Sequence, residues 1–232
     1  MTDGVLLPDG RSLRLDATLA GRVRCGVLVA RGPFGGNGED LATLMARTAD
    51  ELRGRYAGAP PSTIEGLAEA RALYRSFGME PSRHRPSSEA LLRRVLQGRD
   101  LYRLGCVVDA CNLASLSFLL PIGLYDLACV QGDIALTVGA AGDAYAGIRK
   151  EDVNVGGRLA LYDRAGPFGS PTSDSARTRV TDATADLLAV IMATGTLPAP
   201  QMEGRLDLLA GLLVRHSGAQ VTWRRTLGPA EA

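Results

Sequence analysis

Three polar side chains recur at helical spacing within the most apolar segment of the chain. Asp109, Asn112 and Ser115 stand three residues apart in VVDACNLASLSFLL. This spacing places them along one side of a helix predicted over residues 109–120, which is otherwise apolar almost all round and is therefore expected to be buried. Buried polar groups cost free energy unless each has a partner. The sequence thus predicts that a neighbouring loop or a ligand engages these three side chains.

The segment IGLYD follows Pro121, which ends the predicted helix. We interpret it as a turn that carries Tyr125 and Asp126 to the mouth of a cleft. Turns position reactive groups, but they also use Asp side chains for their own hydrogen bonds, so both roles are open for Asp126. Next comes GDIALTV, which is typical of a strand.

A second group of polar side chains lies in the loop AGPFGSPTSDSART, residues 165–178. The Gly, Pro, Ser and Thr content of this loop indicates defined turns rather than a flexible linker. Its polar members include Ser173, Asp174, Arg177 and Thr178. A fixed guanidinium beside an acid and hydroxyls suits a carboxylate, a phosphate or an ester oxygen. Alternatively, Asp174 and Arg177 pair with each other and only stiffen the loop.

Four sequence blocks resemble, in content and order, the B3/B4 domain of the phenylalanyl-tRNA synthetase beta subunit. They are RPSSEALLRRVLQG, VVDACNLASLSFLLPIGLYDL, GDIALTVG, and SDSARTRVT with the apolar run LLAVIM, and together they cover roughly residues 74–193. In that family the domain is an editing module. It hydrolyses tRNA charged with the wrong amino acid, and its pocket accepts tyrosine attached in place of phenylalanine. The resemblance implies a freestanding aminoacyl-tRNA deacylase that acts on mischarged tRNA in the cytoplasm.

The resemblance also implies a metal-free pocket without a Ser–His–Asp triad. An aminoacyl ester is already activated, so the site must position water, polarise the carbonyl and hold the ammonium and side chain of the amino acid. Asn112 is the first choice as a hydrogen-bond donor, and Asp109 is a candidate for the ammonium. The full set of expected residues is catalytic Asn112, Asp126 and Arg177, with substrate-binding Asp109, Ser115, Tyr125, Ser173, Asp174 and Thr178. Bacterial synthetases tend to carry a histidine in the turn, and PIGLYD has none.

The charge of the chain is uneven, although its net value is only +1. Between residues 71 and 103, eight arginines face three acidic residues. Such a basic segment can attract a phosphate backbone, and we expect Arg83, Arg85, Arg93 and Arg94 to contact tRNA. The alternative is compositional, because Lys150 is the only lysine and arginine has replaced lysine throughout.

Composition excludes several other classes of protein. With 46% hydrophobic and 22% charged residues, the chain is expected to bury a core. It has no apolar run of the ~20 residues that cross a bilayer, and its start lacks the features of a secretory signal, so we expect a cytoplasmic protein without membrane contact. The four cysteines lack C-x-x-C spacing and the two histidines stand alone. We therefore expect buried thiols and neither metal nor cofactor, and nothing suggests DNA as a partner.

The expected fold is mixed α/β, with mixed sheets, flanking helices and two lobes around a central cleft. We expect one domain over residues 1–232, with an N-terminal portion at 1–70, the resembling region at 71–196 and a C-terminal helix and strand at 197–232. A hairpin is predicted at residues 5–15, an interior strand at 22–30 and a final strand at 219–227. A capping box predicts a helix over residues 62–75, and Ser87 or Ser88 is expected to cap the helix EALLRRVLQ. The run LLAVIM favours a strand, although its periodicity also allows a helix.

Two other functions fit the same residues. The chain is alternatively a non-catalytic module that binds tRNA or a free amino acid, since near-neutral charge and few aromatics suit a small-molecule pocket. It is also open that the pocket serves another acyl-transfer or hydrolytic reaction on an amino-acid derivative. The altered loop GPFGSPT is the feature that favours this third reading.

Overall fold

Two long strands, β3 (Val23–Arg31) and β10 (Asp186–Thr194), form the centre of the fold. The computed structural model describes residues 4–36, 38–149 and 151–230 of the chain. Both strands are buried along almost their whole length, because successive side chains point into two different cores. They pair antiparallel in a four-stranded sheet of order β11-β3-β10-β4, with β4 (Ile122–Asp126) and β11 (Gln220–Leu227) outside.

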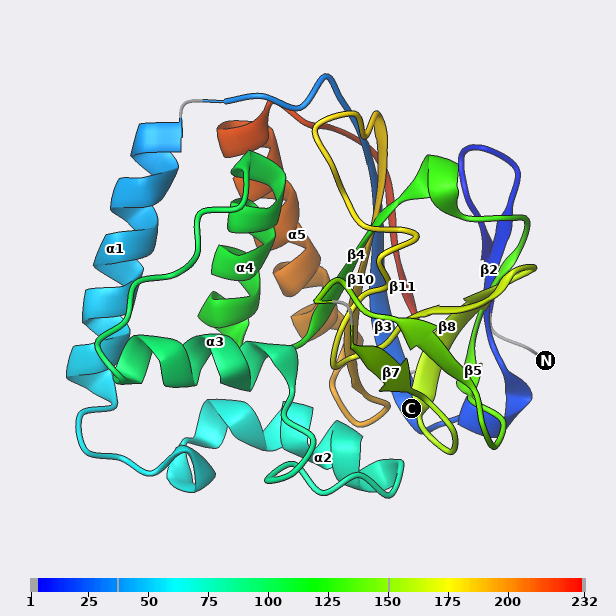
Figure 1. Cartoon of the computed structure of the whole chain (residues 1–232), viewed down its shortest axis with the longest axis horizontal. Coiled ribbons are helices and arrows are strands. Elements are labelled where there is room, and N and C mark those ends of the chain that lie inside the picture. The colour runs from blue at the N-terminus through cyan, green and yellow to red at the C-terminus, as the bar shows by residue number, and fades with distance from the viewer. Residues whose placement is uncertain (1–3, 37, 150, 231–232) are drawn as a thin grey trace.

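One face of this sheet packs on a second sheet of order β1-β2-β5-β8-β9, and Figure 1 shows the two side by side. Its strands are β1 (Gly4–Leu6), β2 (Ser12–Leu15), β5 (Ile134–Val138), β8 (Leu159–Asp163) and β9 (Gly166–Gly169). Pairing is antiparallel except between β2 and β5. Alternate residues of β3, such as Val27 and Val29, join Leu136 and Leu161 in the core between the sheets.

The other face of the four-stranded sheet is covered by helices, which lie on the left in Figure 1. They are α1 (Gly38–Arg55), α3 (Ser87–Leu96), α4 (Cys106–Phe118) and α5 (Ala199–Ser217), with α2 (Ala68–Ser76) packing near the end of β10. Leu28 and Ala30 of β3 point into this second core. The elements therefore stack in three layers, with helices on one side and two sheets on the other.

Short elements connect the layers. A two-stranded ladder of β6 (Ala144–Ala146) and β7 (Asp152–Asn154) precedes β8. In the described part of the chain there are also four 3-10 turns: η1 (Ala17–Leu19), η2 (Pro61–Thr63), η3 (Glu65–Leu67) and η4 (Leu127–Cys129). An isolated bridge between Gly147 and Ser175 brings the small ladder next to the loop after β9.

The mixed α/β class, the N-terminal hairpin, the interior strand and the final strand are confirmed. The run LLAVIM is a strand, because both of its faces are buried in a sheet core. The helix expected over residues 62–75 begins only at Ala68, after two 3-10 turns. The cap of α3 is the backbone of Pro86, without a side-chain hydrogen bond, so the expected capping by Ser87 or Ser88 is wrong.

The expected turn at IGLYD is also wrong, because these residues form strand β4. β4 is an edge strand whose register with β10 sets Tyr125 opposite Leu188. Pro121 and the left-handed Leu119 end α4 and redirect the chain at once into this strand. Burial of Leu124 and Tyr125 against the central sheet outweighs the preference of Gly and Asp for turns. Tyr125 and Asp126 therefore lie in a sheet, beneath the loop that follows β9.

Candidate active site

The carboxyl group of Asp174 lies where the loop after β9 meets β4. Gly169 and Asp174 form an isolated antiparallel bridge, which folds the residues between them into a tight turn. From this position Oδ2 of Asp174 accepts a hydrogen bond from the amide of Leu124 at 3.2 Å. Asp174 is half-buried. Its carboxyl is therefore shielded by protein on the side of β4.

Burial is the main reason that the pKa of Asp174 is raised to about 7, although the Leu124 amide and the Tyr125 hydroxyl act in the opposite direction. The pKa values of Cys111, Tyr125 and Tyr145 are raised by burial and, in addition, by the charge of Asp174. Cys111 belongs to α4, so the helix and the loop approach each other at Asp174. An acid that is half ionised near neutral pH can accept and release a proton there.

The hydroxyl of Tyr125 is buried and has no hydrogen-bond partner within the described residues. It fills space left by two glycines, since a Cβ atom on Gly123 or Gly169 would lie 2.0 or 2.1 Å from its oxygen. Burial is the largest cause that raises the Tyr125 pKa, and the charge and hydrogen-bonding capacity of the nearby Asp174 carboxyl add to it, although the distance and angles between the two groups are not those of a formed hydrogen bond. A polar atom buried in this way costs about 1–3 kcal/mol unless a ligand engages it.

Replacing Tyr125 with phenylalanine tests whether its buried hydroxyl lacks a partner in the folded protein. Because the hydroxyl has no partner, Tyr125→Phe is expected to leave the free energy of unfolding unchanged or to raise it by about 1 kcal/mol. Tyr145→Phe is the matched comparison, since its hydroxyl donates to the carbonyl of Ser173 and shares a second hydrogen bond with Ser170 Oγ at 2.9 Å. Loss of those bonds is expected to cost about 1–2 kcal/mol in urea unfolding. A larger loss from Tyr125→Phe than from Tyr145→Phe would show that Tyr125 has a structural partner.

Of the three α4 residues expected to engage a loop or a ligand, two are held by neighbouring protein groups. Asp109 accepts from Arg103 Nε at 3.0 Å and from the Leu104 amide at 2.8 Å, and Ser115 donates to the Leu120 carbonyl at 2.7 Å. Asn112 is half-buried, and the described residues supply no hydrogen bond to its amide. Asp109 and Ser115 therefore have structural roles, and the amide of Asn112 is available to a ligand.

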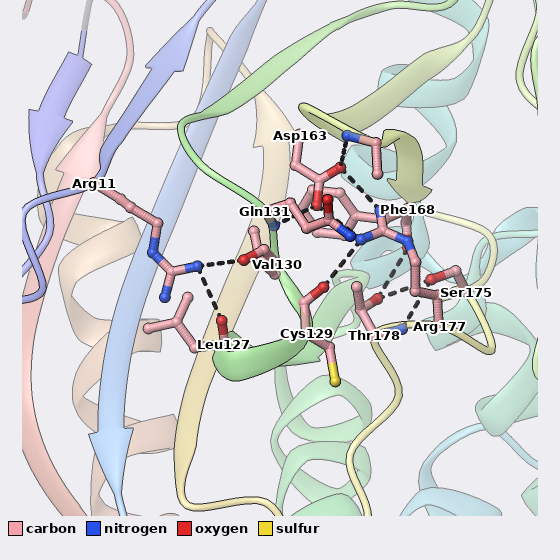
Figure 2. A network of polar contacts seen from close by, with 11 residues as sticks. Arg11, Leu127, Cys129, Val130, Gln131, Asp163, Phe168, Ser175, Arg177 and Thr178 are labelled. Atoms are coloured by element: carbon pink, nitrogen blue, oxygen red, sulfur yellow. Dashed lines mark hydrogen bonds and ion pairs between the residues drawn. The ribbon is translucent and has the colours of Figure 1, made fainter.

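Arg177 points toward Asp163 and the carbonyl of Cys129, as Figure 2 shows. Its guanidinium forms a two-pronged ion pair with Asp163, at 2.9 Å for each contact, and donates to the Cys129 carbonyl at 3.0 Å. The alternative of an Asp174–Arg177 pair is therefore wrong. The carboxyl of Asp163 also accepts from the amides of Gln131 and Ala165. Arg177 thus ties the loop after β9 to η4 and to the end of β8.

Breaking this ion pair is expected to affect the fold. The Asp163 side chain is fully buried and that of Arg177 is 33% exposed. Burial would raise the pKa of Asp163, but hydrogen bonds from Arg177 and two backbone amides outweigh it and hold the pKa below its usual range. Arg177→Gln is expected to lower the free energy of unfolding by about 2–4 kcal/mol, measured in urea at pH 7. Arg179→Gln, at an exposed neighbour, should cost under about 0.5 kcal/mol.

The remaining site candidates hold the loop against β4. Asp126 accepts from Ala128 N at 3.0 Å and Thr184 Oγ1 at 2.8 Å, so both carboxylate oxygens have protein donors. Thr178 is buried, and its hydroxyl pairs with that of Ser175 at 2.9 Å. The carbonyl of Thr178 accepts from the Asp126 amide at 2.8 Å. These contacts position Asp174 without touching it.

Comparisons with known proteins show the family to which the chain belongs. Residues 69–196 match the family described as the B3/4 domain, which is more than half of the chain. The chain belongs to the B3/4 domain family. Among solved structures, this B3/4 domain is similar to an N-terminal fragment of the phenylalanyl-tRNA synthetase beta subunit from Pyrococcus horikoshii, with 14% identity, a TM-score of 0.43, and coverage of 54% of this chain and 46% of that one. No curated protein shows a significant match.

Two of the four arginines expected to contact tRNA have protein partners in this B3/4 domain. Arg93 Nε donates to the buried carboxylate of Glu89 at 2.9 Å, and the guanidinium of Arg94 lies 3.7 Å from the ring centre of Tyr102. Arg83 and Arg85 are exposed. Arg83 and Arg85 therefore remain the better candidates for an external partner.

Three groups beside Asp174 were not expected from the sequence: Cys111, Tyr145 and Ser170. The sequence signal for Ser170 was the hydroxyl-rich SPTS within the loop, but Tyr145 comes from a separate short strand that only the fold brings close. Cys111 is buried, as expected for a small thiol, and so is Cys25. Cys106 is half-buried and Cys129 is exposed, so the expectation of four buried thiols is wrong for these two.

Three cavities, of about 200, 510 and 240 Å³, are lined by residues outside this site. None of the three is the expected cleft between the Asn112 helix and the Arg177 loop. Within the described ranges, no three His, Cys, Asp or Glu side chains gather closely enough to hold a metal ion. In the same ranges, every helix is too short or too polar to cross a bilayer.

Proposed function

We propose that this B3/4 domain is a cytoplasmic aminoacyl-tRNA deacylase, which releases a wrongly attached amino acid by hydrolysing its ester. The observation that carries the proposal is the Asp174 carboxyl, whose pKa is raised to about 7 by burial beside β4. A general base works best when its pKa lies near the working pH. Family membership supports tRNA as the partner, and a tyrosyl ester on tRNA(Phe) is the proposed substrate.

The proposed reaction needs no covalent intermediate. Ionised Asp174 accepts a proton from a water molecule, and the oxygen of that water molecule attacks the ester carbonyl carbon. The carbonyl oxygen becomes negative and takes a hydrogen bond from the free amide of Asn112. When the tetrahedral intermediate collapses, the bond to the ribose oxygen breaks and the proton on Asp174 passes to that oxygen. The products are the free amino acid and tRNA with its terminal hydroxyl restored.

The other candidates have supporting roles in this proposal. Ser173 and the hydroxyl of Tyr125 flank Asp174 and are assigned to substrate binding. Asp109 and Ser115 fix the two ends of α4, and so they set the direction of Asn112. Asp126, Arg177 and Thr178 are positioning residues, because their polar atoms are taken up by protein groups. In this proposal Asp126 and Arg177 therefore do not take the direct catalytic roles expected from the sequence.

The test is release of amino acid from tyrosyl-tRNA(Phe). The wild-type protein is expected to exceed the rate in buffer, and Asn112→Ala to lower that rate about 10²- to 10³-fold, as for loss of an oxyanion donor. Asp182→Asn, at an exposed acid eight residues after Asp174, is the matched control and should leave the rate unchanged. Salt-dependent tRNA binding without any release from a panel of mischarged tRNAs would instead establish the non-catalytic binding module.

A further inference from the structure

A group of cationic side chains surrounds an unusual contact between His84 and Arg158. His84 lies in the loop between α2 and α3, and Arg158 lies just before β8. Nη2 of Arg158 is 3.3 Å from Nε2 of His84, a contact in which a neutral imidazole can present its Nε2 lone pair to the guanidinium. Figure 1 shows these two loops approaching each other at the bottom of the view.

No carboxylate within the described residues forms an ion pair with Arg83, Arg85 or Arg158. The second donor contact of Arg158 is to the carbonyl of Asn154 at 3.0 Å. Glu80 is the acid of the same loop, and its carboxylate faces the Ser82 amide at 3.5 Å. Arg83 and Arg85 are exposed, and His84 and Arg158 are half-buried. Positive charge is therefore concentrated at this surface, where Glu80 is the acid of the loop and forms no ion pair with these three arginines.

The neighbouring positive charges affect the pKa of His84. Burial is the first cause that lowers the pKa of its imidazole, and the charges of Arg158 and Arg83 add to it. A bound anion between these groups would reverse the last two effects, because a protonated imidazole and two guanidinium groups could all donate to it. The contact thus has the character of an anion site whose anion comes from outside the chain.

This cationic group adjoins the turn that carries Asp174. The Ser87 amide donates to the Pro171 carbonyl at 3.4 Å, and the hydroxyl groups of Tyr74 and Thr172 lie 2.8 Å apart. Both contacts join the α2–α3 region to residues 171 and 172, immediately before the acid. An RNA strand that placed its terminal ester at Asp174 would pass its last phosphates near this rim.

We propose that Arg83, His84, Arg85 and Arg158 bind the backbone phosphates of the RNA 3′ end whose terminal ester reaches Asp174. This inference rests on the proposed deacylase function and adds the part of the ligand that the site recognises. Guanidinium groups bind phosphate oxygens through paired donors, and an imidazolium adds a third donor. The recognition is of phosphodiester, so it is expected to depend on salt and hardly on base sequence.

The chain offers a direct reporter, because its only histidines are His84 and His216. His216 is buried in α5 and serves as the internal reference. In proton NMR titrations, an RNA hairpin ending in CCA is expected to raise the His84 pKa by about one unit. The same hairpin should leave the ring chemical shifts of His216 at fixed pH in place. Inorganic phosphate at millimolar concentration should produce a smaller shift of the same sign. A shift with phosphate but none with RNA would overturn the assignment to an RNA end.

Binding of the same hairpin, followed by fluorescence anisotropy, provides the second readout. Arg158→Gln is expected to weaken binding about fourfold at 0.15 M salt and to lower the slope of log K against log salt by about 0.7. Arg55→Gln removes an exposed arginine at the end of α1, well away from this loop, and should change neither quantity. Equal effects of the two substitutions would overturn the proposal.

A phosphate-free substrate separates this inference from the deacylase function. Tyrosine esterified to adenosine carries the reactive bond without any phosphate. If the wild-type protein hydrolyses that ester but the hairpin neither binds nor shifts His84, the phosphate site is refuted and the deacylase stands. If the hairpin binds and shifts His84 while no ester is cleaved, the phosphate site stands and the deacylase is refuted.

Discussion

Asp174→Asn is expected to lower the rate of tyrosyl ester hydrolysis about 10²- to 10⁴-fold, the usual contribution of a general base. Asparagine preserves the shape of the side chain and can still accept the hydrogen bond from Leu124 N, which measures 3.2 Å in the wild type. It cannot take a proton from water. The measurement is single-turnover release of amino acid from tyrosyl-tRNA(Phe), beside Asp182→Asn as the exposed-acid control. A rate within threefold of wild type would remove Asp174 from the chemistry.

The pH dependence of the wild-type rate follows from the same acid. The pKa of Asp174 is raised to about 7, and the ionised form is the active one. The ionised fraction rises about tenfold between pH 6 and pH 8, so the rate should rise by a similar factor and level off above pH 8. Asp174→Asn should lose this dependence and follow only the slope of the uncatalysed ester. A wild-type profile that is flat over this range would contradict the assignment.

Failure to fold is not expected to explain the loss of activity in Asp174→Asn. An acid whose pKa is higher in the folded protein than its ordinary 3.8 binds more protons when folded, so stability falls as pH rises from about 4 to 7. Asparagine carries no ionisable group, so the variant does not lose stability in this way as pH rises. The variant should therefore be more stable than wild type at pH 8, by about 1–3 kcal/mol, and similar to it at pH 4. Such a trade of stability for reactivity is typical of active sites.

Periodicity predicted the elements of this fold well, because burial on one or two faces leaves a repeating pattern in the sequence. α4 lies within three residues of its expected start and two of its expected end, and β10 follows from a short apolar run. IGLYD was misread since Gly and Asp are common in turns, and nothing local reveals that β10 provides a partner strand. Local propensity describes the segment, whereas the sheet decides its conformation.

The candidate site was predicted in its residue types but not in its contacts. Asp174 was identified beside Arg177, yet the arginine pairs with Asp163, fourteen residues away in sequence. The raised pKa of Asp174 depends on burial beside β4, which only the tertiary fold provides. In the same way, the contact between His84 and Arg158 joins residues 74 positions apart, and no spacing rule could indicate it. Side-chain chemistry is local, but the environment that tunes it comes from the fold.

Glu89→Gln is expected to destabilise the fold more than any other single substitution considered for this chain. The Glu89 side chain is 1% exposed and accepts two hydrogen bonds from Arg71, both at 2.8 Å, and one from Arg93 at 2.9 Å. Removing the charge leaves Arg71, only 11% exposed, without its anion. Breaking a buried pair in this way costs about 3–5 kcal/mol, which urea unfolding at pH 7 would measure.

The pH dependence of that loss has a definite sign. Burial would raise the pKa of Glu89, but hydrogen bonds from Arg71 and Arg93 outweigh it and hold the pKa below its usual range. The ionised Glu89 carboxylate therefore stabilises the folded protein at every pH above the ordinary glutamate pKa. This contribution to the free energy of unfolding is lost as pH falls through the lowered pKa. The difference between wild type and Glu89→Gln should shrink in acid, whereas Glu80→Gln, at an exposed acid, should cost under about 0.5 kcal/mol throughout. A Glu89→Gln cost that stays constant down to pH 2 would mean that packing, rather than charge, joins α2 to α3.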